Sequence, residues 1–179
     1  TPLPALFTWV LSISTTNVTF AQNQMAMINP HQGHDMGQHN HTPKELPGNS
    51  LVPQLDLDIS ADTMSGYNLE LIVKDFQLMP PQLASDESSE LSVHKNDKTT
   101  AQGHAHLYIN GVKIQRIYGN HVHLPAKLFN QGINQVSVSL NSHQHETWTK
   151  NNISVLATLF INTEQNPVLQ HSFAAFPIK

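Results

Sequence analysis

Histidines in this chain recur as pairs with one residue between the two rings. Eight of its twelve histidines stand in four such pairs: His39/His41, His104/His106, His121/His123 and His143/His145. Residues i and i+2 of a β-strand point to the same face, so each pair in a strand would present two imidazoles about 6–7 Å apart at the backbone. Both rings can then reach one metal ion, and the spacing predicts metal binding.

The types of ligand available favour copper. The chain has no cysteine, which excludes disulfides, thiol catalysis, zinc–thiolate sites and a blue-copper centre. Neutral imidazole binds Cu, Zn, Ni and Fe, and the general affinity order favours Cu(II) at a nitrogen-rich site. Methionine thioethers select Cu(I) and add little for zinc. We therefore expect copper, as Cu(II) or Cu(I), with zinc or nickel as the alternative.

Three of the pairs lie in the half of the chain where strands are expected, and they are the main candidate ligands. In a β-sandwich they could converge at one end, where strands finish and loops begin. Asn141 and Glu146 are candidate partners that would fix the ring tautomers. The predicted metal ligands of the folded domain are His104, His106, His121, His123, His143 and His145.

Residues 22–50 form a polar segment that is rich in Gly, Pro, Asn and Gln. Such a segment cannot bury enough apolar surface to fold alone, and we expect it to be disordered. His- and Met-rich tracts indicate metal binding by composition. The segment is interpreted as a metal-collecting tail, with an inert linker as the alternative, and its predicted ligands are His31, His34, Met36, His39 and His41.

Composition and charge restrict the class of partner. The net charge is −4 with neutral histidines, charged residues make up 12%, and Arg116 is the single arginine. No basic patch is available to neutralise phosphates, so nucleic acid is not an expected partner. Residues 1–21 resemble a truncated signal peptide, with Thr19-Phe20-Ala21 at its cleavage site. We expect export to the periplasm or beyond, and no membrane span follows that segment.

The rest of the chain has the alternating pattern of short β-strands. Apolar residues alternate with polar ones over 55–60, 69–78 and 136–140, and a more continuous apolar run covers 153–161. Asn110-Gly111 between two β-rich runs predicts a type I′ hairpin. Strands at this spacing predict an all-β, antiparallel β-sandwich over residues 51–162, followed by a C-terminal tail over 163–179, in which Leu169–Phe176 could add an edge strand.

The segment GHAHLYINGVKIQRIYGNHVHLP, residues 103–125, resembles a group of small exported bacterial β-sandwich domains with a GHAHLY(V/I)NG hairpin. In that group a motif ending in His-Leu-Pro and a further strand follow, and the resemblance covers roughly residues 66–161. It implies an immunoglobulin-like or cupredoxin-like sandwich, similar in character to copper-associated periplasmic proteins. The further strand matches at Leu128, Gly132, Asn134, Val136, Val138, Leu140, Asn141 and His143 or His145.

The expected function is non-catalytic copper binding in the periplasm, by which the protein would buffer, scavenge or deliver the metal. Another periplasmic copper protein could then be an exchange partner. No triad or carboxylate pair is evident, so we do not expect an enzyme. A copper-dependent oxidative enzyme would need an N-terminal histidine, whereas cleavage after Ala21 leaves Gln22 first. The other alternative is an exported structural or adhesive module that binds no metal.

Overall fold

The computed structural model describes residues 42–81, 91–93, 98–165 and 169–179. Almost all of its regular structure is β, apart from one 3-10 turn, η2 (Ala126–Leu128). The strands are β1 (Pro43–Glu45), β2 (Gln54–Ala61), β3 (Tyr67–Lys74), β4 (Phe76–Leu78), β5 (Leu91–Val93), β6 (Thr99–Ile109), β7 (Val112–Ile117), β8 (His121–Leu124), β9 (Ile133–Asn141), β10 (Thr147–Lys150), β11 (Ile153–Ser154), β12 (Leu156–Asn162) and β13 (Leu169–Ala174).

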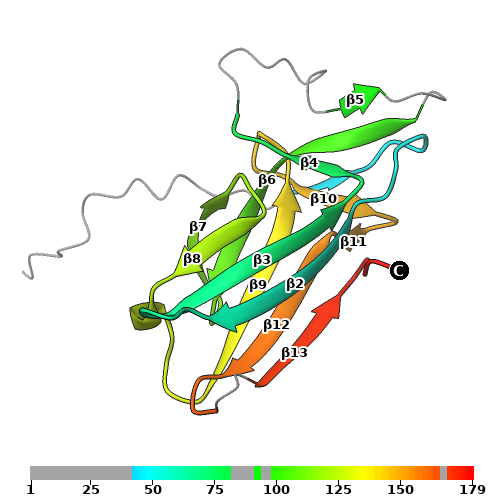
Figure 1. Ribbon diagram of the computed structural model, residues 1–179. Helices are drawn as coiled ribbons and strands as arrows, with labels where there is room; N and C mark the ends of the chain where they lie inside the picture. Colours follow the sequence, from blue (N-terminus) through cyan, green and yellow to red (C-terminus); the bar gives the residue numbers. More distant parts are fainter. Residues whose placement is uncertain (1–41, 82–90, 94–97, 166–168) are drawn as a thin grey trace, which may run out of the picture. The chain divides into compact units, whose positions relative to one another are not determined.

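The strands form two sheets. The smaller sheet has the order β2-β3-β8, and all its pairings are antiparallel. The larger sheet has the order β1-β10-β9-β12-β13, with β6 alongside β9 and with β4, β5 and β7 paired to β6. Only the β1–β10 and β4–β6 pairings are parallel among these named strands. The expected all-β sandwich with mainly antiparallel strands is confirmed (Figure 1).

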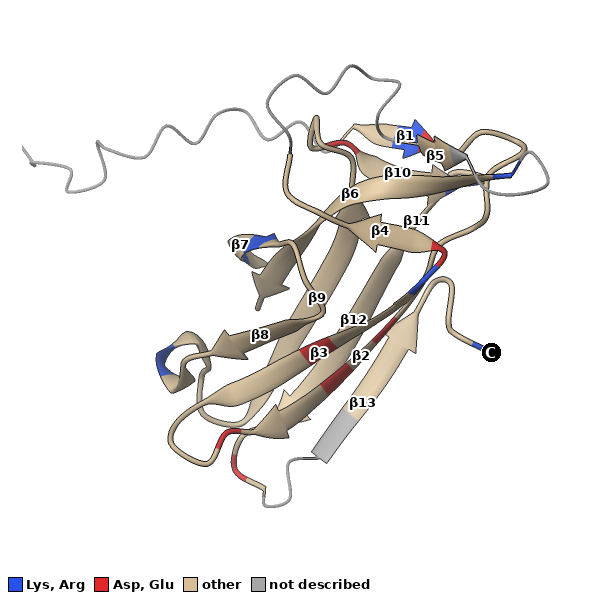
Figure 2. Ribbon diagram, turned by 45° about the horizontal axis from the view of Figure 1, so that its top comes forward, with Lys and Arg blue, Asp and Glu red and all other residues tan. Residues whose placement is uncertain are grey.

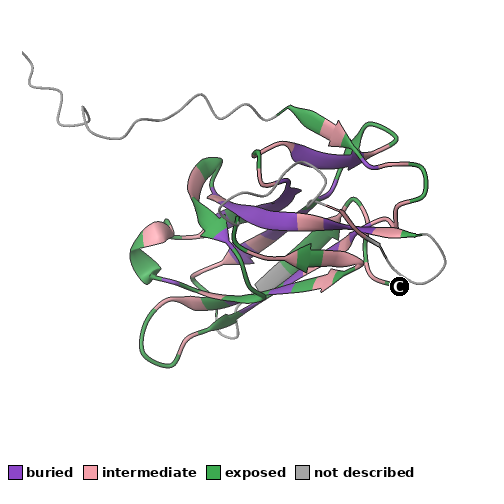
Figure 3. Ribbon diagram, turned by 90° about the horizontal axis from the view of Figure 1, so that it is seen from above, coloured by how far each residue is buried: buried purple, intermediate pink, exposed green. Residues whose placement is uncertain are grey.

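The hydrophobic core lies between the two sheets, where β2 and β3 cross β9 and β12 (Figure 1). Leu55, Leu57 and Ile59 alternate with polar residues along β2, and all three are buried. The larger sheet contributes Leu107 and Val138 among others. Burying such a side chain contributes about 1.5–3 kcal/mol, so the period-two pattern decides which face of each strand turns inward. In Figure 3 buried segments lie mainly in the strands, which also contain exposed residues, and the connections are mostly exposed or half-buried.

The hairpin between β6 and β7 turns at the two residues that the sequence indicated. Asn110 has φ 51° and Gly111 has φ 79°, the positive angles that a type I′ turn requires. The Asn110 side chain accepts a hydrogen bond from the backbone N–H of Gln135 at 2.9 Å. The turn is thereby fixed to β9, and β6 runs between β7 and β9.

Two segments that were expected to lie outside the domain contain strands that belong to it. Strand β1 falls within residues 22–50, and Leu46 beside it is buried. The Glu45 carboxylate accepts hydrogen bonds from Thr149, Asn151 and Asn152, and the bond from the Asn151 backbone has the largest effect in lowering its pKa. Strand β13 falls within residues 163–179 and pairs with β12. Strand β1 depends on a partner distant in sequence, which local composition does not reveal, whereas β13 pairs with β12, the strand just before it in the chain.

Some predicted features lie outside the described residues. These are the signal peptide over 1–21 and the five candidate ligands of the tail, His31, His34, Met36, His39 and His41. Among the residues that are described, no helix is long and apolar enough to cross a membrane.

Candidate metal centre

His104 and His106 lie on the face of β6 that points away from the core. Their neighbours Ala105 and Leu107 point into the core. The two histidines pair across the sheet with Asn141 and Ser139 of β9, respectively. Both imidazoles are nevertheless fully buried, at 0% exposure. This outer face of β6 is therefore covered by other residues and is not solvent-exposed surface. A buried imidazole needs partners for its ring nitrogens.

His145 reaches the same place from the turn between β9 and β10. The backbone N–H of Ser142 donates to the carbonyl of Glu146 at 2.8 Å, and that of His145 donates to the carbonyl of Ser142 at 3.0 Å. His145 has φ 71°, a left-handed conformation that costs about 1–2 kcal/mol outside glycine. A strained residue of this kind persists where the surrounding structure holds it.

The turn is held by a charged pair and by Asn141. Glu146 accepts a hydrogen bond from the Ser142 hydroxyl at 3.3 Å, and the Lys44 ammonium lies 3.0 Å from its carboxylate. The Asn141 amide donates to the Thr147 hydroxyl at 3.1 Å and to the His145 carbonyl at 3.5 Å. Asn141 and Glu146 were expected to fix ring tautomers. These bonds instead fix the backbone that carries His145.

Three ring nitrogens come together at this point. The Nε2 atoms of His104 and His106 are 2.9 Å apart, and Nε2 of His106 is 3.2 Å from Nδ1 of His145. Two nitrogens that each lie about 2.0–2.1 Å from one ion, about 90–110° apart, are separated by about 2.9–3.4 Å. All three ligand atoms lie within 4.8 Å of one another. One ion spans about 4.2 Å between opposite nitrogens, so at most a small ring rotation completes the set.

Hydrogen bonding alone does not account for this convergence. A neutral imidazole has one donor and one acceptor nitrogen. Nε2 of His106 nevertheless has three nitrogen neighbours, in His104 at 2.9 Å, His145 at 3.2 Å and Lys113 at 3.3 Å. A single ring nitrogen can share one proton along its lone-pair direction, so these contacts cannot all be hydrogen bonds. Nitrogen atoms crowded about one point in this way fit a shared metal ion.

The protonation state of His104 suits metal coordination. Burial, followed by the charges of His145, Arg116, His143 and Lys113, lowers its pKa from 6.5 to about 3. The ring is therefore neutral at physiological pH, and the neutral ring is the form that binds metal. Its Nδ1 is buried without a hydrogen-bond partner, which costs about 1–3 kcal/mol. This uncompensated polar atom is consistent with a site built for binding and not for stability.

The remaining predicted ligands of the domain lie at different distances from this cluster. The His143 ring stacks near that of His104, with 6.3 Å between centroids and 24° between planes. It lies outside the group whose ligand atoms meet. His121 and His123 lie on β8 of the smaller sheet and are exposed. Nδ1 of His123 is 3.3 Å from the Asn68 side chain and 4.0 Å from Asp62. The structure thus joins residues of two pairs and places the third elsewhere.

Residues that the pairing pattern did not indicate complete the surroundings. Lys113 of β7 contacts His106, and the Tyr118 ring lies 5.8 Å from that of His104. Arg116 stands opposite His106 in the β6–β7 register. Lys113 stands opposite Tyr108 in the same register. Figure 2 shows basic residues on β7 and acidic residues on β2 and β3.

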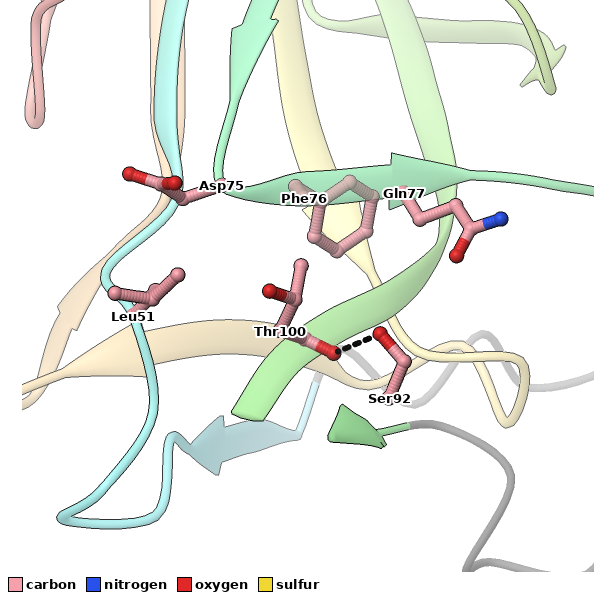
Figure 4. Close-up of a pocket in the computed structure, with 6 residues that line it drawn as sticks. All are labelled: Leu51, Asp75, Phe76, Gln77, Ser92 and Thr100. Carbon is pink, nitrogen blue, oxygen red and sulfur yellow. Dashed lines mark hydrogen bonds between the residues drawn. The ribbon is translucent and has the colours of Figure 1, made fainter. Parts of the chain in front are cut away.

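A cavity beside β4 is separate from the histidines. It has a volume of about 470 Å³ and is lined by Leu51, Asp75, Phe76, Gln77, Ser92 and Thr100. Asp75 and Gln77 extend to opposite sides of Phe76, so their polar groups do not converge (Figure 4). A second cavity of about 360 Å³ shares Tyr108 and Ser139 with the region around His106. Among the described residues, the side chains that could bind a metal meet at the imidazole cluster and not in the cavity beside β4.

No family model, curated protein or solved structure matches this chain. The resemblance to exported GHAHLY(V/I)NG domains therefore stays a prediction. The metal centre rests on its own geometry, which is given by His104, His106 and His145.

Proposed function

We propose that this protein binds copper in the periplasm and buffers, scavenges or delivers it. The observation that carries the proposal is the meeting of three imidazole nitrogens at separations suited to one ion. Two come from a strand of the sandwich and one from a braced turn, so the centre is held by the fold. Such a role needs reversible coordination and no nucleophile or general base.

Copper is the metal that best suits these ligands. The cluster offers imidazole nitrogens only, and the affinity order at such sites places Cu(II) above Zn(II). Structural zinc sites usually have four ligands, whereas three meet here. The methionines of residues 22–50 add ligands suited to Cu(I) in the same chain. Export, supported by the apolar stretch over residues 1–21, would place the protein where both oxidation states of copper occur.

The three histidines differ in how firmly the fold holds them. His104 and His106 form a fixed pair, because β6 is paired with both β7 and β9. His145 lies in the turn between β9 and β10. The ion pair between Glu146 of this turn and Lys44 of β1 holds the turn against β1. A rigid pair with one ligand on a turn can take up or release an ion by a local movement of that turn.

The test is a copper titration of the full chain in which residues 31, 34, 36, 39 and 41 are replaced, so that only the domain reports. We expect one equivalent of copper to bind. The variant H104N/H106N/H145N should lose it, whereas H121N/H123N, which removes an exposed pair on β8, should retain it. Circular dichroism confirms that each variant is folded.

Three results would decide against the proposal. Unchanged copper binding by a folded H104N/H106N/H145N variant would place the metal elsewhere. Tighter binding of Zn(II) than of either copper ion would make this a zinc protein. No binding of any metal by the parent protein would leave a structural module whose histidines form a polar cluster.

A further inference from the structure

Positively charged side chains face the histidine cluster from β7. The Lys113 ammonium lies 3.3 Å from Nε2 of His106, the nitrogen at the middle of the cluster. Arg116 stands opposite His106 in the β6–β7 pairing. Its charge lowers the pKa of both Lys113 and His104, in each case as a smaller effect than burial. A bound cation would therefore experience the positive charges of both Lys113 and Arg116.

Two acidic groups of the adjoining β1–β10 region are engaged with other partners. The Glu146 carboxylate contacts Ser142 and Lys44, and the Glu45 carboxylate accepts three hydrogen bonds from the β10–β11 region. The group of ligand atoms that meet contains no carboxylate among the described residues. Asp56, Asp58 and Glu70 belong to the smaller sheet (Figure 2). The cluster thus offers neutral nitrogens beside fixed positive charge.

We infer that Lys113, supported by Arg116, makes this centre selective for singly charged Cu(I) over doubly charged Cu(II) and Zn(II). The inference rests on the proposed function. Coulomb repulsion is proportional to the product of the charges, so an ammonium beside the site opposes a divalent ion twice as strongly as a monovalent one. Lys113 is partly buried, which reduces screening by salt. Neutral imidazoles accept either oxidation state, and the neighbouring charge then determines the preference.

The experiment compares Cu(I) and Cu(II) affinities of the same tail-substituted full chain carrying K113M, K113R or K127M. Met keeps the length of the Lys113 side chain and removes its charge, whereas Arg keeps the charge. Lys127 lies on η2 and serves as a control for removing one charge. In K113M we expect Cu(II) affinity to rise about tenfold more than Cu(I) affinity, because one fixed charge is lost. This ratio corresponds to a reduction potential about 59 mV lower. K113R and K127M should leave the ratio unchanged.

Two results would overturn the inference while leaving the proposed function intact. Equal changes of both affinities in K113M would mean that Lys113 affects only the packing or accessibility of His106. Cu(II) binding as tight as Cu(I) binding whenever phosphate or chloride is present would mean that Lys113 recruits an anion. Absence of copper binding in the parent protein would instead be a failure of the proposed function itself. Copper that binds to the parent protein and is lost in the H104N/H106N/H145N variant excludes that case.

Discussion

At the scale of single residues, His104 combines complete burial with an uncompensated ring nitrogen. Its exposure is 0% and its Nδ1 has no hydrogen-bond partner. Such a group is destabilising in isolation, yet it occupies the middle of a well-paired strand. Conflict between a local preference and the fold is expected at functional sites. The cost at His104 is therefore better understood as a requirement of the proposed metal centre than as a defect of packing.

The low pKa of His104 predicts acid sensitivity of the metal-free protein. In the folded chain its pKa is about 3, against an ordinary value of 6.5. Between these values the unfolded chain binds a proton that the folded chain does not, so stability falls as the pH falls. The loss approaches about 1.4 kcal/mol per pH unit and ends near pH 3. Urea unfolding at a series of pH values from 7 to 4 measures this slope.

The variant H104N removes the titrating ring and should flatten that slope. H171N removes an exposed imidazole from β13 and serves as the matched control, with the acid sensitivity retained. An H104N variant that remained as acid-sensitive as the parent protein would show that another group is responsible.

Sequence reasoning found the histidines but not the residues that surround them. Spacing identified His104 and His106 as a pair, because alternation along a strand depends only on local geometry. Arg116 could not be placed, because the β6–β7 register shifts between Leu107 and Tyr108. An unshifted two-residue hairpin would put Gln115 opposite His106. One extra residue in a strand changes every later pairing, and no residue type in this segment marks the shift.

At the scale of elements, the close approach of β6 to β9 depends on Gly103. This residue has φ 152°, and a Cβ there would collide with the carbonyl oxygen of Asn141. Asn141 is the cross-strand partner of His104. Because residue 103 has no side chain, β6 can approach the end of β9 closely. The turn that contains His145 begins at that end of β9.

We predict that G103A lowers the free energy of unfolding by about 2–3 kcal/mol, because overpacking and backbone strain add. G103A should also weaken copper binding, because a shift of the backbone at residue 103 would displace His104, the next residue in the chain. The control is G119A, where an added Cβ meets nothing within 4 Å, and we expect little change there. Urea unfolding and copper titration measure the two effects. A G103A variant with the stability of the parent would contradict the close packing.

Elements defined by local sequence were predicted, and those defined by distant partners were not. The β6–β7 hairpin follows from Asn110-Gly111, whose positive φ angles the structure confirms. Strand β1 has only three residues and exists because it pairs with β10, about a hundred residues later in the chain. Its composition resembles that of the polar segment before it. No local pattern distinguishes a short strand of this kind from a loop.

At the scale of the whole molecule, the assignment of strands to sheets decides which histidines can share an ion. β6 and β9 belong to the larger sheet, and the β9–β10 turn brings His145 to β6. β8 pairs with β3 in the smaller sheet, so His121 and His123 lie beside Glu70 and Asn68. All three pairs have the same spacing in the sequence. Which sheet a strand joins is set by packing across the core, and spacing alone does not determine it.

Copper binding at a centre formed by tertiary structure should stabilise the whole fold. His145 lies 39 positions after His106 in the chain, so the unfolded chain lacks the three-ligand site. At a free copper concentration 100 times the dissociation constant, the gain is about 2.7 kcal/mol. For a chain of 150–250 residues this corresponds to a rise in Tm of about 5–11 °C. Thermal unfolding of the full chain with and without copper measures it.

The same measurement separates the centre from the tail. A copper site formed by the tail ligands of residues 31–41 alone would bind copper equally in folded and unfolded chains if those ligands act independently of the fold, and linkage then gives no stabilisation. The tail-substituted protein and H121N/H123N should keep the full rise in Tm, whereas H104N/H106N/H145N should lose it. A rise in Tm that persisted in the last variant would place the stabilising metal outside the cluster. A titration counts every bound ion, but the melting temperature reports only those whose binding depends on the folded arrangement of β6 and the β9–β10 turn.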